Sequence, residues 1–291
     1  MKNVDVMRAA VLMGHGDIDQ LHVREDIPIP RPGREEVLIR VGASAVNNTD
    51  VNTRVGWYSQ SRSDADTAWS GNPMKFPRIQ GADCCGQITS VGSAIDPARI
   101  GERVLVRTMQ EPLSVDGDLI PITLGSEIDG AFAEYLSVRG SEAFVIDSPL
   151  DDADLASFPC SYSTAEGLLQ RAQVGAERVL ITGASGGVGS AAVQLAAMRG
   201  ASVVAGTTGA HADDVKRIGA ADTIDRASDL VDQLGDSSID VVIDLVGGPH
   251  FESLLRVLRP GGRYAIAGAV AGAHVALDLR DLYLKDLTFY G

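Results

Sequence analysis

The pattern of apolar and polar positions changes character about halfway along the chain. In the first half, short apolar runs alternate with turns rich in proline and glycine. These runs predict β strands over residues 8–12, 36–46, 86–91, 102–107 and 131–138. Residues 59–75 and 109–129 carry no such pattern and are expected to form long loops. The first half is therefore expected to be an irregular, mostly antiparallel β domain.

From about residue 153, strand patterns and helix patterns alternate. Strands are predicted over residues 178–182, 202–208, 222–225, 240–246, 263–269 and 287–290. Helices are predicted over residues 188–199, 212–218 and 251–258. Such alternation predicts a doubly wound, six-stranded parallel sheet with helices on both faces. We expect an α/β protein with two domains, residues 1–150 and 151–291.

Charge and composition exclude several classes of protein. The chain has 25 Lys and Arg against 39 Asp and Glu, a formal net charge of −14. An acidic surface repels nucleic acid and anionic lipid, so neither is expected as a partner. The sequence has neither a transmembrane stretch nor the apolar core of a signal peptide, and its three cysteines are too few for a disulfide framework. We expect a cytoplasmic protein that acts on a small molecule.

The strongest local signal is a glycine-rich turn between a predicted strand and a predicted helix. Its residues are Gly183, Ala184, Ser185, Gly186, Gly187, Val188 and Gly189. Glycine at 186 and 187 would allow a pyrophosphate to approach the backbone, and Gly189 would let the helix pack on the strand. A tight turn without a ligand has the same appearance, but the surrounding alternation favours a dinucleotide site.

The end of the second predicted strand bears on the choice of cofactor. An NAD site has an acidic residue there, but this strand ends in Thr207 and Thr208 without a carboxylate. Thr207, Thr208 and His211 could hydrogen-bond a 2′-phosphate. NADPH is therefore favoured, and a relaxed site that also accepts NADH stays open.

Five further segments carry motifs. They are 47–58 (NxxDxxxRxGxY), 76–86 (FPxIxGxDxxG), 101–104 (GERV), 130–135 (GAFAEY) and 240–248 (DVVIDxVGG). With the glycine-rich turn, they make the chain resemble the medium-chain dehydrogenase/reductase superfamily, in particular its zinc-less quinone oxidoreductase (zeta-crystallin-like) branch. The resemblance implies a GroES-like catalytic domain, a Rossmann domain and an active site in the cleft between them.

The resemblance also implies roles for single residues. Asn47 and Tyr58 would contact the substrate, with Tyr58 able to donate a proton, and Thr164 would hold the nicotinamide carboxamide. Val246 and Gly268 would contact the cofactor. Structural roles stay open for several of these side chains: Asn47 could cap a turn, Tyr58 could pack as a loop aromatic, and Asp83 could brace its loop.

Catalytic zinc is not expected. In zinc-dependent members of the superfamily, the three ligand positions correspond to Asn47, Ala82 and Cys160, and one ligand cannot hold the metal. Adjacent strand residues point to opposite faces, so Cys84 and Cys85 should not reach one metal. Without a Lewis acid the substrate must spread the charge of an added hydride itself, as quinones and α,β-unsaturated carbonyls do.

The sequence thus predicts an NADPH-dependent quinone or enone reductase. The alternatives are an NADPH-binding protein without turnover and, less favoured, a zinc-dependent alcohol dehydrogenase. The resemblance further implies a C-terminal segment that returns to the catalytic domain, which the chain lacks after residue 291. An apolar sixth strand over residues 287–290 would form the sheet edge through which two subunits pair as a homodimer.

Overall fold

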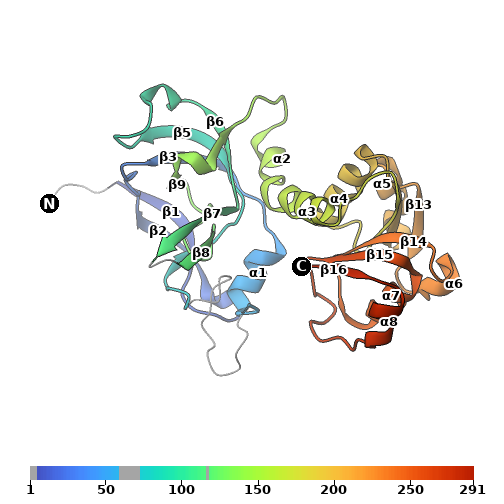
Figure 1. The fold of residues 1–291 in the computed structure, drawn as a ribbon. Coiled ribbons are helices and arrows are strands. Elements are labelled where there is room, and N and C mark those ends of the chain that lie inside the picture. The colour runs from blue at the N-terminus through green and yellow to red at the C-terminus, as the bar shows by residue number, and fades with distance from the viewer. Residues whose placement is uncertain (1–4, 59–72, 116–117) are drawn as a thin grey trace. The chain divides into compact units, whose positions relative to one another are not determined.

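The computed structural model describes residues 5–58, 73–115 and 118–291 (Figure 1). The chain divides into two compact units, Met1–Cys160 and Ser161–Gly291, and each is described by itself. The boundary expected from the sequence lies slightly earlier, at residue 150.

The first unit consists mainly of antiparallel strands, as predicted. A five-stranded sheet has the order β10-β6-β5-β3-β9, and a three-stranded sheet has the order β2-β1-β4. The strands are β1 (Val6–Leu12), β2 (Leu21–Pro28), β3 (Glu36–Ala43), β4 (Arg78–Ile79), β5 (Cys85–Val91), β6 (Arg103–Val106), β9 (Tyr135–Arg139) and β10 (Ala143–Val145). Alternate residues of β3, such as Val37 and Ile39, are fully buried in the apolar core of the first unit.

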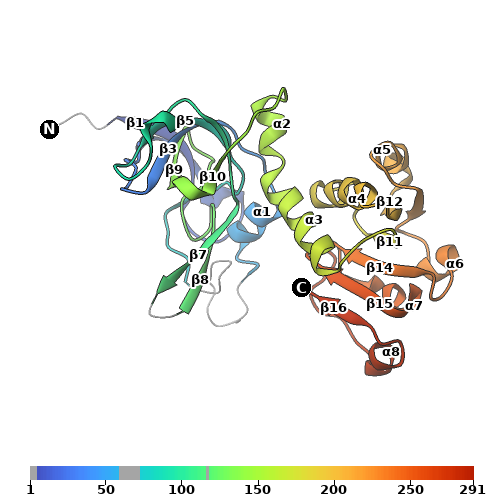
Figure 2. The same ribbon diagram turned by 45° about the horizontal axis from the view of Figure 1, so that its top comes forward.

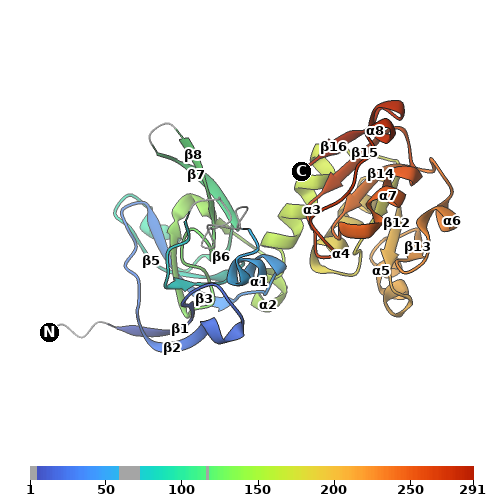
Figure 3. The same ribbon diagram turned by 90° about the horizontal axis from the view of Figure 1, so that it is seen from below.

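The expectation of a long loop over residues 109–129 is wrong. Strands β7 (Met109–Val115) and β8 (Asp118–Thr123) pair there as an antiparallel hairpin that extends from the unit (Figure 3). Pro112 and Pro121 interrupt the apolar alternation and obscure the strand signal. The Asp-Gly pair at 116–117 is a sequence signal for a hairpin turn, and it favours a hairpin over the expected loop. Most of the other expected loop, 59–75, lies outside the described residues.

The first unit also contains short helices that the sequence pattern did not predict. They are α1 (Asn48–Val55) and α2 (Asp152–Ala156), and the unit ends in the first turn of α3 (Pro159–Arg171). The buried residues of α1 are Asp50 and Thr53, so it has no apolar stripe from which a helix could be recognised.

The second unit confirms the predicted six-stranded parallel sheet. Its order is β13-β12-β11-β14-β15-β16, and all neighbouring strands are parallel (Figure 2). The strands are β11 (Arg178–Ile181), β12 (Ser202–Thr207), β13 (Asp222–Asp225), β14 (Ile239–Asp244), β15 (Leu258–Ile266) and β16 (Thr288–Tyr290). β16 is the outermost strand of this sheet. The homodimer expected through this strand stays a prediction.

Helices cover both faces of this sheet. Val179 and Ile181 of β11 belong to one core with residues of α3, α4 (Gly187–Met198) and α5 (Ala212–Arg217). Leu180 faces the other core, which includes residues of α6 (Leu230–Leu234), α7 (Phe251–Val257) and α8 (Leu279–Leu284). β11 is therefore apolar on both sides, as is typical of a central parallel strand. Across the described residues, no helix is both long and apolar enough to cross a membrane.

A buried carboxylate ties α1 to the segment that precedes β5. Asp50 accepts hydrogen bonds from the backbone N–H groups of Asn47 at 2.8 Å and Ala82 at 3.0 Å. Burial raises the pKa of Asp50 to about 6, since the hydrogen bonds from the two N–H groups only partly compensate the lost hydration. The ionised form of Asp50 therefore destabilises the first unit.

The first unit should accordingly lose stability as the pH rises from about 4 to 7. In this range the unfolded chain releases the Asp50 proton near pH 4 and the folded unit only near pH 6, so deprotonation favours the unfolded state. We expect Asp50→Asn to remove on the order of 2–3 kcal/mol of this pH dependence. Both tryptophans, Trp57 and Trp69, belong to the first unit, so denaturation followed by tryptophan fluorescence reports on it. An identical pH profile for the variant would contradict the assignment.

Candidate functional site

The glycine-rich turn joins the end of β11 to the start of α4. Gly183 has φ +61°, a left-handed conformation that favours glycine. A Cβ at Gly189 would lie 2.1 Å from the carbonyl oxygen of Gly183, so only glycine allows α4 to pack this closely. The turn and the helix therefore hold the geometry in which helix N-termini present free N–H groups to an anion.

Gly186 and Gly187 are different, because the protein itself does not require glycine there. A Cβ would lie 3.4 Å from the Gly183 oxygen at position 186 and 3.7 Å from Cβ of Ser161 at position 187, both without a steric clash. Gly186 also has an ordinary negative φ of −78°. The bare backbone at the start of α4 is thus a cradle that a side chain would fill, and it fits the close approach of a dinucleotide pyrophosphate.

Other predicted cofactor contacts gather at the same edge of the sheet, where the parallel strands end. Cγ2 of Val246 lies 3.2 Å from where a Cβ of Gly183 would be, so the loop after β14 borders the turn. The backbone N–H of Ala184 donates to the Gly206 oxygen at 3.2 Å, which connects the turn to β12. A Cβ at Gly268 would lie 2.3 Å from the Leu245 oxygen, so the segment after β15 also packs closely there.

The end of β12 holds the three residues considered for a 2′-phosphate. Thr207 is buried, and within the described part of the chain its hydroxyl oxygen has no hydrogen-bond partner, an arrangement that a bound ligand would correct. Thr208 is half-buried. His211 is exposed, and its Nδ1 lies 3.6 Å from a carboxylate oxygen of Asp214, which disfavours an added anion beside it.

Sequence reasoning missed a cation near this position. The backbone N–H of Arg226 donates to the carbonyl oxygen of Thr207 at 3.0 Å, and the Arg226 side chain is exposed. Arg226 directly follows β13, so it is distant from Thr207 in the sequence but lies beside the end of β12 in the sheet. The pairing of β12 with β13 brings Arg226 to this position, and no local sequence motif marks the residue.

In the first unit, Asn47 precedes α1 and is held by a buried carboxylate. Its amide Nδ2 donates to Asp83 Oδ2 at 2.8 Å. A carboxylate only accepts, so this bond fixes the orientation of the Asn47 amide and uses one of its two amide hydrogens. Asn47 is only half-buried, and within the described residues its amide nitrogen donates to Asp83 alone, which leaves the second hydrogen for an acceptor such as a substrate oxygen.

Asp83 braces this part of the unit from a fully buried position. Its Oδ1 accepts from the backbone N–H of Cys160 at 2.7 Å and from Thr108 Oγ1 at 3.1 Å. Its own carbonyl oxygen accepts from Ser44 Oγ at 2.5 Å. Burial raises the pKa of Asp83, and the donated hydrogen bonds oppose that rise. The bracing role left open for Asp83 is therefore supported by its contacts.

Tyr58 and Thr164 have well-defined positions. Tyr58 follows α1 and folds back on it, with its hydroxyl donating to Thr49 Oγ1 at 3.0 Å. This places the phenol oxygen beside the first turn of α1, the turn that Asn47 precedes. Thr164 is half-buried in α3 within the second unit.

The residues at the three zinc positions do not fit a catalytic zinc ion. Ala82 is buried and has no side-chain donor atom, and Asn47 offers only a neutral amide oxygen in place of a thiolate, imidazole or carboxylate ligand. In the absence of a metal ion, burial raises the pKa of the Cys160 thiol to about 12. Cys84 and Cys85 belong to two different apolar clusters, as their alternation predicts. No group of three or more His, Cys, Asp or Glu able to hold a metal occurs in the described ranges.

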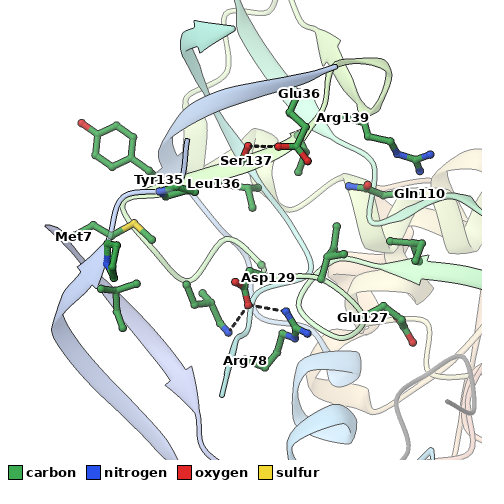
Figure 4. A pocket seen from close by; sticks show the side chains of 18 residues that line it. Met7, Glu36, Arg78, Gln110, Glu127, Asp129, Tyr135, Leu136, Ser137 and Arg139 are labelled. Atoms are coloured by element: carbon green, nitrogen blue, oxygen red, sulfur yellow. Dashed lines mark hydrogen bonds and ion pairs between the residues drawn. The ribbon is translucent and has the colours of Figure 1, made fainter. Parts of the chain in front are cut away.

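A separate cavity of about 500 Å³ lies in the first unit (Figure 4). It is bordered by Met7, Arg78, Gln110, Asp129 and residues of β9, and Arg78 Nη1 donates to Asp129 there at 2.8 Å. Neither Asn47 nor Tyr58 lines it. This cavity is therefore distinct from the polar cluster around Asn47.

Comparison with known proteins gives two family matches and several relatives. Residues 33–149 match the alcohol dehydrogenase GroES-like domain, and residues 187–291 match the family described as zinc-binding dehydrogenase. The chain is 30% identical to an NADPH-dependent alkenal/one oxidoreductase of Arabidopsis thaliana chloroplasts over 91% of this chain, but it spans only 63% of that protein. It is 30% identical to the acryloyl-coenzyme A reductase of Sulfurisphaera tokodaii, covering 98% of this chain and 84% of the relative.

Two further similarities agree with these. The human quinone oxidoreductase is 29% identical, with 98% of this chain and 80% of the relative covered. A crystal structure from Sinorhizobium meliloti 1021, of a protein assigned to the alcohol dehydrogenases, superposes with a TM-score of 0.90 at 43% identity and covers 98% of this chain and 82% of its own. The two domain matches and these relatives show that the chain belongs to the medium-chain dehydrogenase/reductase superfamily.

Proposed function

We propose that the protein is an NADPH-dependent oxidoreductase that reduces a quinone or an α,β-unsaturated carbonyl without catalytic zinc. The main support for this proposal is the bare backbone at Gly186 and Gly187. A Cβ atom at either position would meet no steric clash in the protein, whereas a bound pyrophosphate would need this space to be free of side chains. The named activities of the relatives, on alkenals, acryloyl-coenzyme A and quinones, support the substrate class.

Bound NADPH would supply the hydride. The N–H groups at the start of α4 would bind its phosphates, because they are free of intrahelical partners and lie at the positive end of the helix dipole. Val246 and Gly268 would border the nicotinamide half, since they follow β14 and β15. Thr164 is proposed to hold the carboxamide.

The end of β12 favours a 2′-phosphate. It has no carboxylate at Thr207 or Thr208, so neither residue would repel the additional charge. Arg226 would supply the positive charge that the neighbouring threonines lack.

The polar cluster of the first unit would act on the substrate oxygen. Asn47 keeps one amide hydrogen available, and Asp83 holds the amide so that this hydrogen need not reorient during the reaction. The Tyr58 phenol would donate the proton that balances the added hydride. Because Asn47, Ala82 and Cys160 do not fit the ligand set of a zinc site, the substrate itself would delocalise the negative charge, which would limit the reaction to conjugated acceptors.

The glycine cradle can be tested with a matched pair of variants. Gly187→Val should abolish NADPH binding, because its side chain would extend into the space for the pyrophosphate, whereas its Cβ would lie 3.7 Å from Cβ of Ser161, an ordinary van der Waals distance. Gly175→Val is the control, since Gly175 precedes β11 and also has open space around it. Unchanged NADPH affinity of Gly187→Val, measured by fluorescence titration, would show that the cradle is not the phosphate site.

The 2′-phosphate assignment predicts a change in cofactor preference. Arg226→Ala should weaken NADPH binding about tenfold and leave NADH binding unchanged, because only NADPH carries the charge that Arg226 would meet. Arg217→Ala removes another exposed arginine of the same unit, paired with Asp214, and should change neither affinity. Equal effects of Arg226→Ala on both cofactors would argue against the assignment.

Exchanging Asn47 and Asp83 separates a structural from a functional role of Asn47. Asn47→Asp should destabilise the first unit by bringing two carboxylates together, and Asp83→Asn by facing two amide donors. The double variant restores a hydrogen bond in the reverse direction, so its stability by tryptophan fluorescence should recover. Its kcat with a 1,4-quinone should nevertheless stay about 100-fold low, because a carboxylate at position 47 offers the substrate no N–H. Recovery of turnover together with stability would make Asn47 purely structural.

A further inference from the structure

A further buried carboxylate, Asp244, lies at the carboxyl end of β14 with no exposed surface. Its Oδ1 accepts from Thr182 Oγ1 at 2.5 Å, from the Val246 N–H at 2.9 Å and from the Gly247 N–H at 3.1 Å. Its Oδ2 accepts from the Tyr264 hydroxyl at 2.5 Å and from the Gly247 N–H at 3.2 Å. All of these donors are neutral, so backbone and hydroxyl dipoles alone hold this carboxylate in the interior.

The contacts of Asp244 connect three strands at one edge of the sheet. Thr182 directly follows β11 and opens the glycine-rich turn, and Tyr264 belongs to β15. Thr182 Oγ1 also accepts from the Leu245 N–H at 2.9 Å, so the loop after β14 is bound to the turn twice. Burial and the adjacent carboxylate raise the pKa of the Tyr264 phenol, which keeps it a donor.

The loop that Asp244 holds is on the nicotinamide side of the sheet. In a doubly wound sheet of this strand order, the first three strands bind the adenosine half of a dinucleotide, and the strands across the switch point bind the other half. β14 is adjacent to β11 across that point. Val246 follows β14, and its side chain borders Gly183 of the turn.

We infer that Asp244 is a positioning residue for the nicotinamide half of the cofactor, and this inference rests on the proposed function. The carboxylate fixes the backbone at Val246 and Gly247 against the glycine-rich turn, and thereby sets the wall on which the nicotinamide lies. Its removal would release this loop while the adenosine half of the site, between β11 and β13, keeps its shape.

Two ligands separate this role from a general effect on folding. We would measure by titration calorimetry the binding of NADPH, which has both halves, and of 2′,5′-ADP, which has only the adenosine half. Asp244→Ala should weaken NADPH binding tenfold or more and change 2′,5′-ADP binding less than twofold. Asp240→Ala is the matched control, since Asp240 accepts from the Arg178 N–H at 2.8 Å near the opposite end of β14, and it should affect neither ligand.

Two milder variants keep the inference testable where Asp244→Ala does not fold. Tyr264→Phe removes one donor and should weaken NADPH binding about threefold, again without an effect on 2′,5′-ADP. Asp244→Asn keeps an oxygen for Thr182 and Val246 and should retain most of the affinity. Parallel loss of both ligands, or no loss of NADPH in Asp244→Ala and Tyr264→Phe, would overturn the inference. Failure of the unmodified protein to bind either ligand would instead refute the proposed function.

Discussion

The second unit depends on how closely α4 approaches the end of β11. A side chain of any size at position 189 would collide with the Gly183 carbonyl, so the helix starts directly against the turn. This contact fixes the direction of the first turn of α4 and leaves its N–H groups without intrahelical partners. The loops after β12, β14 and β15 pack around the same point. A single steric constraint thus places these N–H groups at the carboxyl edge of the parallel sheet, where we propose that the cofactor phosphates bind.

Each unit also contains a buried carboxylate that organises the chain around it. Asp83 accepts from Asn47, Thr108 and the backbone of Cys160 in the first unit, and Asp244 accepts from Thr182, Tyr264 and two backbone N–H groups in the second. Both carboxylates are buried among hydrogen-bond donors, and both hold candidate site residues, Asn47 and Val246, in place. At Asp83 this arrangement fixes the orientation of the Asn47 amide.

Much of the fold followed from periodicity, because the central strands of the parallel sheet are apolar on both sides and are bounded by turns. Several of the missed elements have a polar or interrupted signal, but α3 was missed although its buried residues 161, 165, 168 and 169 have helical spacing. Helix α1 buries Asp50 and Thr53 in place of an apolar stripe, and the β7–β8 hairpin contains Pro112 and Pro121. The glycine-rich turn was readable as a local motif. Arg226 and Asp244 were not, since their importance arises from strand pairing and from contacts between residues up to 62 positions apart, such as Thr182 and Asp244.

The most direct test of the account is a fluorescence titration of the purified 291-residue chain with NADPH and, in parallel, with NADH. The geometry of the turn and the uncharged end of β12 predict saturable binding of NADPH, tighter than that of NADH. Absence of binding by either cofactor would contradict the assignment of the glycine cradle, and a preference for NADH would contradict the role given to Arg226.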